Sequence, residues 1–284
     1  MRETVEFRVV EKFAPLLFAE GEGKQLGTSG PPSIRKVVLA TTDPRYARVG
    51  ELQKSLKQSK GKSFFFGWTI NYEYSDDEIC AAPLLHLNIT EAFEPAGEEC
   101  GTQYDETAAC PICGAGARQV TPLYLPQERI PRSKDISRTI AGEIVVSRQI
   151  QELFLRHQIK GAQLNPLRYN KKSSSESSDW FQLITDHEAE IAPQTKVGIA
   201  PFDEDEKGTY RCPKGDTLEL NLLSELSIKA STAMASDIMG SRQYLGCRRG
   251  LLRPERQILI SQRLYRLLKA EKIKGFKVDV AHLV

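Results

Sequence analysis

The stretch IVVSRQIQELFLRHQIKGAQ, residues 144–163, has a counterpart near the other end of the chain, ILISQRLYRLLKAEKIKGFK, residues 258–277. The two stretches align without a gap at a constant offset of 114 residues (258 − 144). Six of the twenty positions are identical, including the Ile-Lys-Gly run at 159–161 and 273–275. Because composition alone would give about one or two identities, we predict an internal repeat.

Each copy has the pattern of a strand, a helix and a second strand. In the first copy a short apolar run is followed by Ser147, a residue typical of a helix N-cap. Ile150, Leu153 and Phe154 then recur at helical spacing, and Gly161 supplies the helix stop. The second copy repeats these features from Ser261 onward. The second strands are expected at residues 162–168 and 276–283.

The repeat extends upstream of these helices. Cys110-Pro111 pairs with Cys212-Pro213, and Asp135-Ile136 pairs with Asp237-Ile238, both at an offset of 102 residues (212 − 110). The second copy therefore holds twelve more residues (114 − 102), which we place in 243–256. Two unrelated amphipathic helices would explain the periodicity but neither constant offset, so we favour a duplication.

The remaining segments carry strand, helix and loop patterns. Residues 35–41 form an apolar run, 46–58 have helical spacing, and aromatic residues alternate along 64–74 as on one face of a strand. The polar residues 170–178 are expected to be a loop. We predict an α+β (mixed α/β) fold with two duplicated strand–helix–strand modules, a zinc-knuckle connector and an N-terminal α/β region. The predicted domains are 1–98, 99–169 and 180–284.

The segment Cys110-Pro-Ile-Cys113-Gly is typical of a zinc knuckle, in which two thiolates point at one ion. The repeat-equivalent Cys212 offers a third thiolate, and Cys100 lies ten residues before Cys110. We therefore predict a structural zinc that joins the two halves. Its predicted ligands are Cys100, Cys110, Cys113 and Cys212, with His86 and Asp216 as weaker substitutes. The alternative is a pair of ordinary free thiols or a decayed site.

Composition excludes several classes of protein. Of the 284 residues 40% are hydrophobic and 27% are charged, as in a globular protein with an ample core. No apolar run approaches membrane length, and the N-terminus alternates charged and apolar residues unlike a signal peptide, so we expect a cytoplasmic protein. The chain has four histidines and neither a GxSxG nor an HExxH pattern. We do not expect an enzyme.

The knuckle Cys110–Gly114 and the C-terminal run Arg253–Val280 resemble the myxobacterial double-CXXCG proteins and related immunity proteins of polymorphic toxin systems. The resemblance covers residues 100–284 and implies duplicated α/β modules with cysteine knuckles. It also implies a binding protein that masks a partner toxin. The second knuckle, Cys212-Pro-Lys-Gly215, departs from the CxxCG pattern of the family.

A second hypothesis is a zinc-containing nucleic-acid-binding protein that uses the basic segment 242–277. Residues 237–284 hold eleven Lys or Arg against four Asp or Glu, a net charge of +7. Such a segment can follow a phosphate backbone. An acidic protein partner would use the same surface, and aromatic residues for base stacking are sparse there. Protein binding is therefore our first prediction. The arginines concerned are Arg242, Arg248, Arg249, Arg253 and Arg256.

Overall fold

The computed structural model describes residues 1–27, 33–169, 176–233 and 235–284, and it divides the chain into two compact units. The first unit is Met1–Glu78 with Ala200–Glu204, and the second is Ile79–Ile199 with Asp205–Val284. Both contain helices and strands, which confirms the mixed α+β class. Within the described residues, no helix combines the length and the apolar character needed to cross a membrane.

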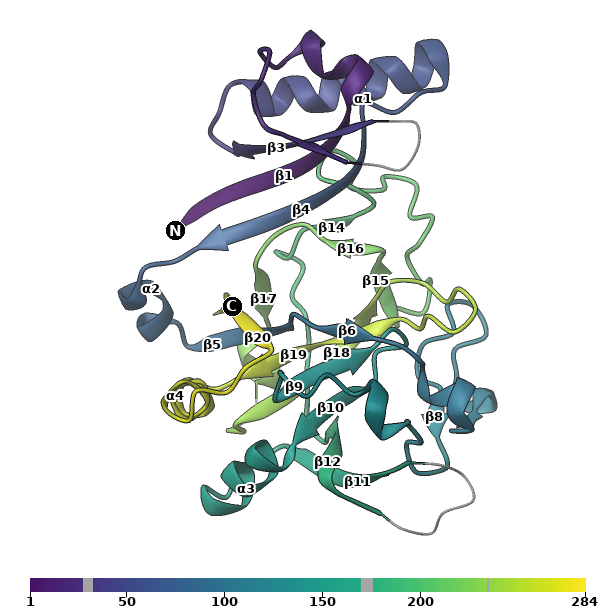
Figure 1. Cartoon of the computed structure of the whole chain (residues 1–284), viewed down its shortest axis with the longest axis vertical. Coiled ribbons are helices and arrows are strands. Elements are labelled where there is room, and N and C mark those ends of the chain that lie inside the picture. The colour runs from purple at the N-terminus through teal and green to yellow at the C-terminus, as the bar shows by residue number, and fades with distance from the viewer. Residues whose placement is uncertain (28–32, 170–175, 234) are drawn as a thin grey trace. The chain divides into compact units, whose positions relative to one another are not determined.

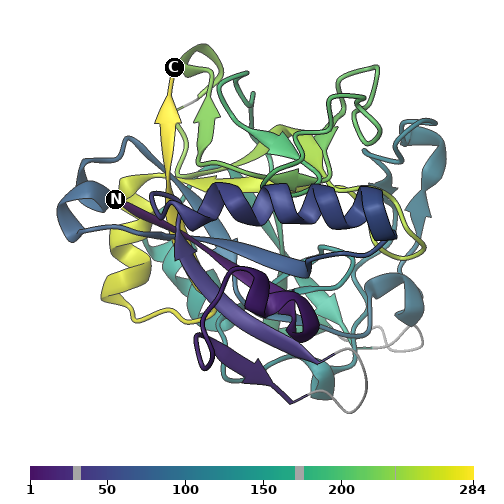
Figure 2. The same cartoon turned by 90° about the horizontal axis from the view of Figure 1, so that it is seen from above.

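The first unit is an antiparallel four-stranded sheet covered by one long helix, α1, seen in Figures 1 and 2. The strand order is β2-β3-β1-β4. Val49 and Leu56 of α1 are buried in the same apolar cluster as Phe7 of β1. The predicted elements at 35–41, 46–58 and 64–74 are confirmed to within a few residues. The elements are β1 (Arg2–Val10), β2 (Lys24–Leu26), β3 (Ile34–Ala40), α1 (Arg45–Lys60) and β4 (Phe65–Glu73).

The second unit contains two larger sheets (Figure 1). One has the strand order β11-β12-β10-β9-β6 and the other β13-β18-β19-β5-β20-β17, with β15 also paired to β18. The strands of the first are β6 (Ala92–Phe93), β9 (Ile136–Thr139), β10 (Ile144–Ser147), β11 (Ala162–Arg168) and β12 (Glu176–Thr185). Those of the second are β5 (Leu84–Ile89), β13 (Glu188–Ala189), β15 (Thr217–Glu219), β17 (Leu226–Ile228), β18 (Ile238–Leu245), β19 (Glu255–Ile260) and β20 (Phe276–Leu283).

The remaining elements of the second unit are short. Two small antiparallel pairs join β7 to β8 and β14 to β16. The helices that follow β10 and β19 are α3 and α4, and they coincide with the two helices predicted from the repeat. The bounds are α2 (Asp76–Ala81), which begins in the first unit, β7 (Tyr104–Asp105), β8 (Arg118–Gln119), α3 (Arg148–Arg156), β14 (Val197–Gly198), β16 (Asn221–Leu222) and α4 (Gln262–Ala270).

The two large sheets correspond strand by strand. The strand order β11-β12-β10-β9-β6 can be aligned with the order β20-β5-β19-β18-β13, so that each strand has equivalent neighbours in the two sheets. In both orders only the last strand is parallel to its neighbour. The registers agree as well. Leu87 of β5 lies opposite Ile258, and Leu183 of β12 lies opposite Ile144.

In each of these orders the second strand, β12 or β5, comes from the other half of the chain. β5 pairs with β19 and β20, whereas β6, which follows it directly, pairs with β9 in the other sheet. In the same way β12 pairs with β10 and β11, and β13 then pairs with β18. Each sheet therefore combines strands that are distant in sequence, and the two sheets exchange a strand.

This exchange corrects the predicted domain limits. Residues 79–98 belong to the second unit because β5 pairs with β19 and β20, so the boundary lies after Glu78 and not at residue 98. Segment 99–169 and segment 180–284 without Ala200–Glu204 lie in one compact unit. The loop expected at 170–178 is shorter, because β12 begins at Glu176, and its residues 170–175 lie outside the described residues.

One apolar core serves both sheets and both helices of the second unit. Ile150 and Leu153 of α3 lie in the same buried cluster as Leu264 and Leu268 of α4. Both helices present this face because their apolar residues recur every three or four positions. The core therefore fixes the two strand–helix–strand segments against each other.

Candidate metal centre

Three thiols and one carboxylate come together in the second unit. The ligand atoms of Cys110, Cys113, Cys212 and Asp216 all lie within 4.8 Å of one another. Cys110 and Cys113 stand between β7 and β8, whereas Cys212 and Asp216 directly precede β15. The group thus joins two segments about a hundred residues apart.

The two segments that supply these side chains have the same local turn. The backbone N–H of Cys110 donates to the carbonyl of Ala115 at 2.7 Å, and that of Cys212 donates to the carbonyl of Thr217 at 2.8 Å. Each hydrogen bond closes a tight loop that holds the cysteine side chain at its start. The turns therefore present their ligands in the same way.

Two of the distances between ligand atoms, both from Cys212 Sγ, fit a tetrahedral zinc ion. Bonds of about 2.3 Å to sulfur at tetrahedral angles place two thiolate sulfurs about 3.8 Å apart. Cys110 Sγ and Cys212 Sγ are 3.7 Å apart. A sulfur and a carboxylate oxygen bound at about 2.0 Å are expected to lie about 3.5 Å apart. Cys212 Sγ and Asp216 Oδ2 are 3.5 Å apart.

The surroundings of Cys212 favour its thiolate form, which is the form that binds metals. Burial of the side chain acts to raise its pKa, but hydrogen bonds from the backbone N–H groups of Lys214 and Asp216 outweigh it. The pKa of Cys212 therefore lies below its ordinary value. Soft thiolates in this number select zinc over hard cations such as Mg²⁺ or Ca²⁺.

The structure brings together three of the four predicted ligands. Cys100 is outside the group, because it packs beside the buried cluster that contains Leu123 and Leu125. Burial and the charges of Glu99 and Glu143 raise the pKa of Cys100, which opposes thiolate formation. Asp216 takes its place in the group, whereas His86 lies on β5 and is buried elsewhere.

A signal for Asp216 was present in the repeat. At the offset of 102 residues, Gly215 matches Cys113 and Asp216 matches Gly114. The residue after the missing cysteine therefore provides the carboxylate. A shift of one position within a tight turn is enough to bring that side chain to the same centre.

A cavity of about 360 Å³ borders the three thiols, and Cys247 also lines it. Sequence reasoning did not connect Cys247 with the knuckles, because it lies in the extended β18–β19 connection that has no counterpart in the first copy. Tyr210, Arg211 and Arg248 complete the polar wall of this cavity. No protein-family model matches the chain, and no curated protein matches it either.

Proposed function

We propose that the chain is a non-catalytic protein-binding protein whose second unit is a duplicated scaffold closed by a structural zinc ion. The observation that carries this proposal is the meeting of Cys110 and Cys113 with Cys212 and Asp216, whose ligand atoms all lie within 4.8 Å of one another. Four protein ligands would fill a tetrahedral ion and leave no position for a substrate, as in structural zinc sites. Within this proposal the partner is a toxin, and the chain is its immunity protein.

Exposed apolar side chains beside the metal centre support a protein partner. Ile112, between the two knuckle cysteines, is 58% exposed, and Leu252 in the β18–β19 connection is 45% exposed. Arg211, Arg248 and Arg249 lie around the cavities that these residues line. Apolar side chains with a polar rim are typical of protein–protein interfaces.

Four of the five arginines named for the basic segment have acidic partners within the chain, which weakens the nucleic-acid alternative. Arg248 pairs with Glu106 at 2.6 Å, and Arg253 pairs with both Glu98 and Glu106. Arginines in internal ion pairs are less available to phosphates. Two further pairs are Arg242 with Glu190 and Arg256 with Glu188.

The test is to co-express the tagged chain with the product of the adjacent gene and to analyse the purified material by size-exclusion chromatography. We expect a stable complex that protects the cell from the partner. The double variant Ile112→Asp and Leu252→Asp should lose the complex. Leu155→Asp is the matched control, because Leu155 is 68% exposed on α3.

Two results would contradict the proposal. One is the absence of any complex together with no protection of the cell. The other is tight, salt-sensitive binding of DNA or RNA in gel-shift titrations at two salt concentrations, which would favour the nucleic-acid function. Metal content is a separate readout, and one equivalent of zinc per chain is expected.

A further inference from the structure

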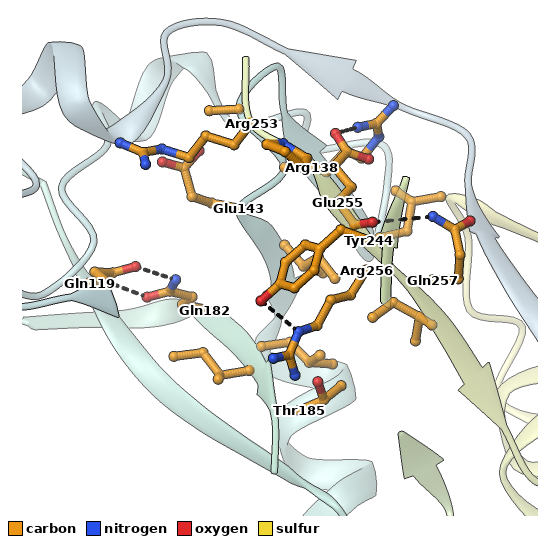
Figure 3. A pocket seen from close by; sticks show the side chains of 18 of the residues that line it. Gln119, Arg138, Glu143, Gln182, Thr185, Tyr244, Arg253, Glu255, Arg256 and Gln257 are labelled. Atoms are coloured by element: carbon orange, nitrogen blue, oxygen red, sulfur yellow. Dashed lines mark hydrogen bonds and ion pairs between the residues drawn. The ribbon is translucent and has the colours of Figure 1, made fainter. Parts of the chain in front are cut away.

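A polar cavity of about 620 Å³ in the second unit is lined by strands of both large sheets (Figure 3). Pockets for small organic ligands have volumes of about 300–1,000 Å³ and hold a few fixed polar groups. The metal-site residues do not line this cavity. It is therefore a second candidate site that shares no lining residue with the cavity around Ile112, although Arg138 and Arg253 also line the cavity around Leu252.

The polar side chains of the cavity are held in place by one another. Gln119 and Gln182 exchange amide hydrogen bonds of 3.0 and 2.7 Å. Arg256 donates from Nε to the Tyr244 hydroxyl at 2.9 Å, and Figure 3 shows this pair at the cavity wall. Such preorganised groups bind a ligand at a lower entropic cost than mobile ones.

Two guanidinium groups keep donors for a ligand. Arg138 pairs through Nη1 with Glu255, and Arg256 uses Nε and Nη1 for Tyr244 and Glu188. Among the described residues, neither Nη2 group has a protein acceptor. Because a guanidinium has five N–H donors in a planar fork, each can also bind an oxyanion.

The unused N–H donors of the lining, rather than its net charge, favour an anion, because each of its arginines also pairs with a carboxylate. Four arginines and two glutamates line the cavity. Glu143 is already satisfied, because Tyr104 donates to it at 2.8 Å and the Thr139 hydroxyl and the Gly97 N–H donate as well. Glu255 is neutralised by its pair with Arg138. The arginines are Arg118, Arg138, Arg253 and Arg256.

A comparison of corresponding strands shows where the two halves differ. Positions that hold the frame are the same in both halves, namely Asp135/Asp237, Ser147/Ser261 and Gly161/Gly275. Polar positions at the cavity differ, namely His86/Gln182, Arg138/Gly240 and Glu143/Gln257. Two similar halves thus form one asymmetric cavity, as a site for an asymmetric ligand requires.

The geometry points to a binding site for a small organic anion, with its carboxylate or phosphate group on Arg138 or Arg256 and its neutral polar part facing Gln119 and Gln182. Guanidinium forks match both acidic groups. The site goes beyond the proposed partner binding and does not depend on it.

Isothermal titration calorimetry with citrate and with adenosine 5′-monophosphate tests the site and separates the two acidic groups. Sodium chloride at equal ionic strength is the control. We expect at least one probe to bind with a Kd of about 1 mM or tighter. Arg256→Gln and Arg138→Gln should each weaken that binding at least about tenfold. Arg156→Gln is the matched control, because Arg156 pairs with Glu271 on the exposed surface.

Thermal melts of each variant establish that it is folded before its affinity is compared. Arg256 contacts the Tyr244 hydroxyl, the Tyr244 ring and Glu188, so Arg256→Gln is the variant more exposed to a folding defect. If it fails to fold, Arg138→Gln still tests the proposal. The proposal is overturned if neither probe binds the unaltered protein below about 10 mM. It is also overturned if binding is the same in both folded cavity variants as in Arg156→Gln. Loss of partner binding in Ile112→Asp would leave these results unchanged.

Discussion

Asp135 and Asp237 each join the two halves of the second unit through equivalent hydrogen bonds. Asp135 Oδ2 accepts a hydrogen bond from the backbone N–H of Lys274 at 2.8 Å, and Asp237 Oδ2 accepts one from that of Lys160 at 3.1 Å. Their Oδ1 atoms accept from Ser147 and Ser261, the residues that precede α3 and α4. Each aspartate therefore links the start of one helix to the chain that follows the other helix.

These links predict a large effect of truncation at either aspartate. Asp237→Ala should destabilise the protein by about 2–3 kcal/mol, because partly buried donors lose the charged acceptor of a buried side chain. Asp135→Ala should have a similar but smaller effect, since Asp135 is less buried. Urea denaturation followed by circular dichroism measures both. Asp179→Ala is the control, because Asp179 makes only an exposed pair with Arg148 and a hydrogen bond with Ser178. Equal stability of all three variants would contradict the linking role.

The glycines that follow the two helices are expected to tolerate no side chain. Gly161 and Gly275 have φ of 101° and 105°. A Cβ atom at Gly275 would lie 2.0 Å from the carbonyl oxygen of Ile136, so backbone would have to move. Gly275→Ala should cost more than about 3 kcal/mol. Gly250→Ala, at φ 58° with open space, should cost only about 1 kcal/mol. Similar melting temperatures for the two variants would argue against the close contact.

Metal removal provides a third prediction. Cys212→Ala should reduce bound zinc and lower the melting temperature, because the proposed ion would tie residues before β8 to residues before β15. Asp216→Ala should weaken zinc binding, whereas Cys100→Ala should retain one equivalent. Mass spectrometry under native conditions and a chelator titration measure these changes. Loss of zinc in Cys100→Ala but not in Asp216→Ala would restore the ligand set first predicted from the sequence.

Local sequence signals predicted where helices and strands lie along the chain, but they did not predict which strands pair with each other. The Ser147 cap and the helical spacing of Ile150 and Leu153 located the start of α3, because that spacing is set within the helix itself, but α3 ends at Arg156 and not at Gly161. The strand exchange has no such signature. β5 finds its neighbours about 170 residues further along the chain, and nothing in its own residues specifies them.

Smaller errors have equally specific causes. The alternating aromatic pattern predicted Phe66 on the same face as Phe64, but Phe66 is exposed and Phe65 is buried. The register of β1 and β4 shifts between Arg8 and Val9, which moves the alternation by one residue. At the candidate metal centre the thiols predicted four ligands, of which Cys100 lies outside the group. Asp216, predicted only as a weaker substitute, joins it because of the exact turn before β15.

His86 predicts how stability responds to acid. Burial lowers the pKa of His86 to about 4, although a hydrogen bond with Gln257 opposes this. The folded state therefore disfavours the protonated His86 ring. The free energy of unfolding is unaffected by this group above about pH 6.5 and decreases as the pH falls toward 4. At pH 5 the loss is about 2 kcal/mol. His86→Gln, which copies the corresponding Gln182, should lose less stability than the unaltered protein between pH 7 and pH 5. Urea denaturation at both pH values measures this, and parallel losses would contradict it.

Glu219 predicts the opposite response at alkaline pH. Burial raises its pKa to about 7; a hydrogen bond from the Leu220 N–H opposes this, and the neighbouring Asp205 adds to it. The protonated form is favoured in the fold, so stability falls as the pH rises from about 4.5 through 7. Raising the pH from 5 to 8 should cost the unaltered protein about 2–3 kcal/mol through this group.

Glu219→Gln places a neutral amide donor beside Asp205 and removes the carboxyl group that titrates. This variant should therefore be more stable than the unaltered protein at pH 8 and differ little from it at pH 5. Denaturation at the two pH values measures the difference. Glu271→Gln is the control, because Glu271 lies at the surface in a pair with Arg156. A Glu219→Gln variant that is equally destabilised at both pH values would show that the carboxyl group acts through packing and not through its charge.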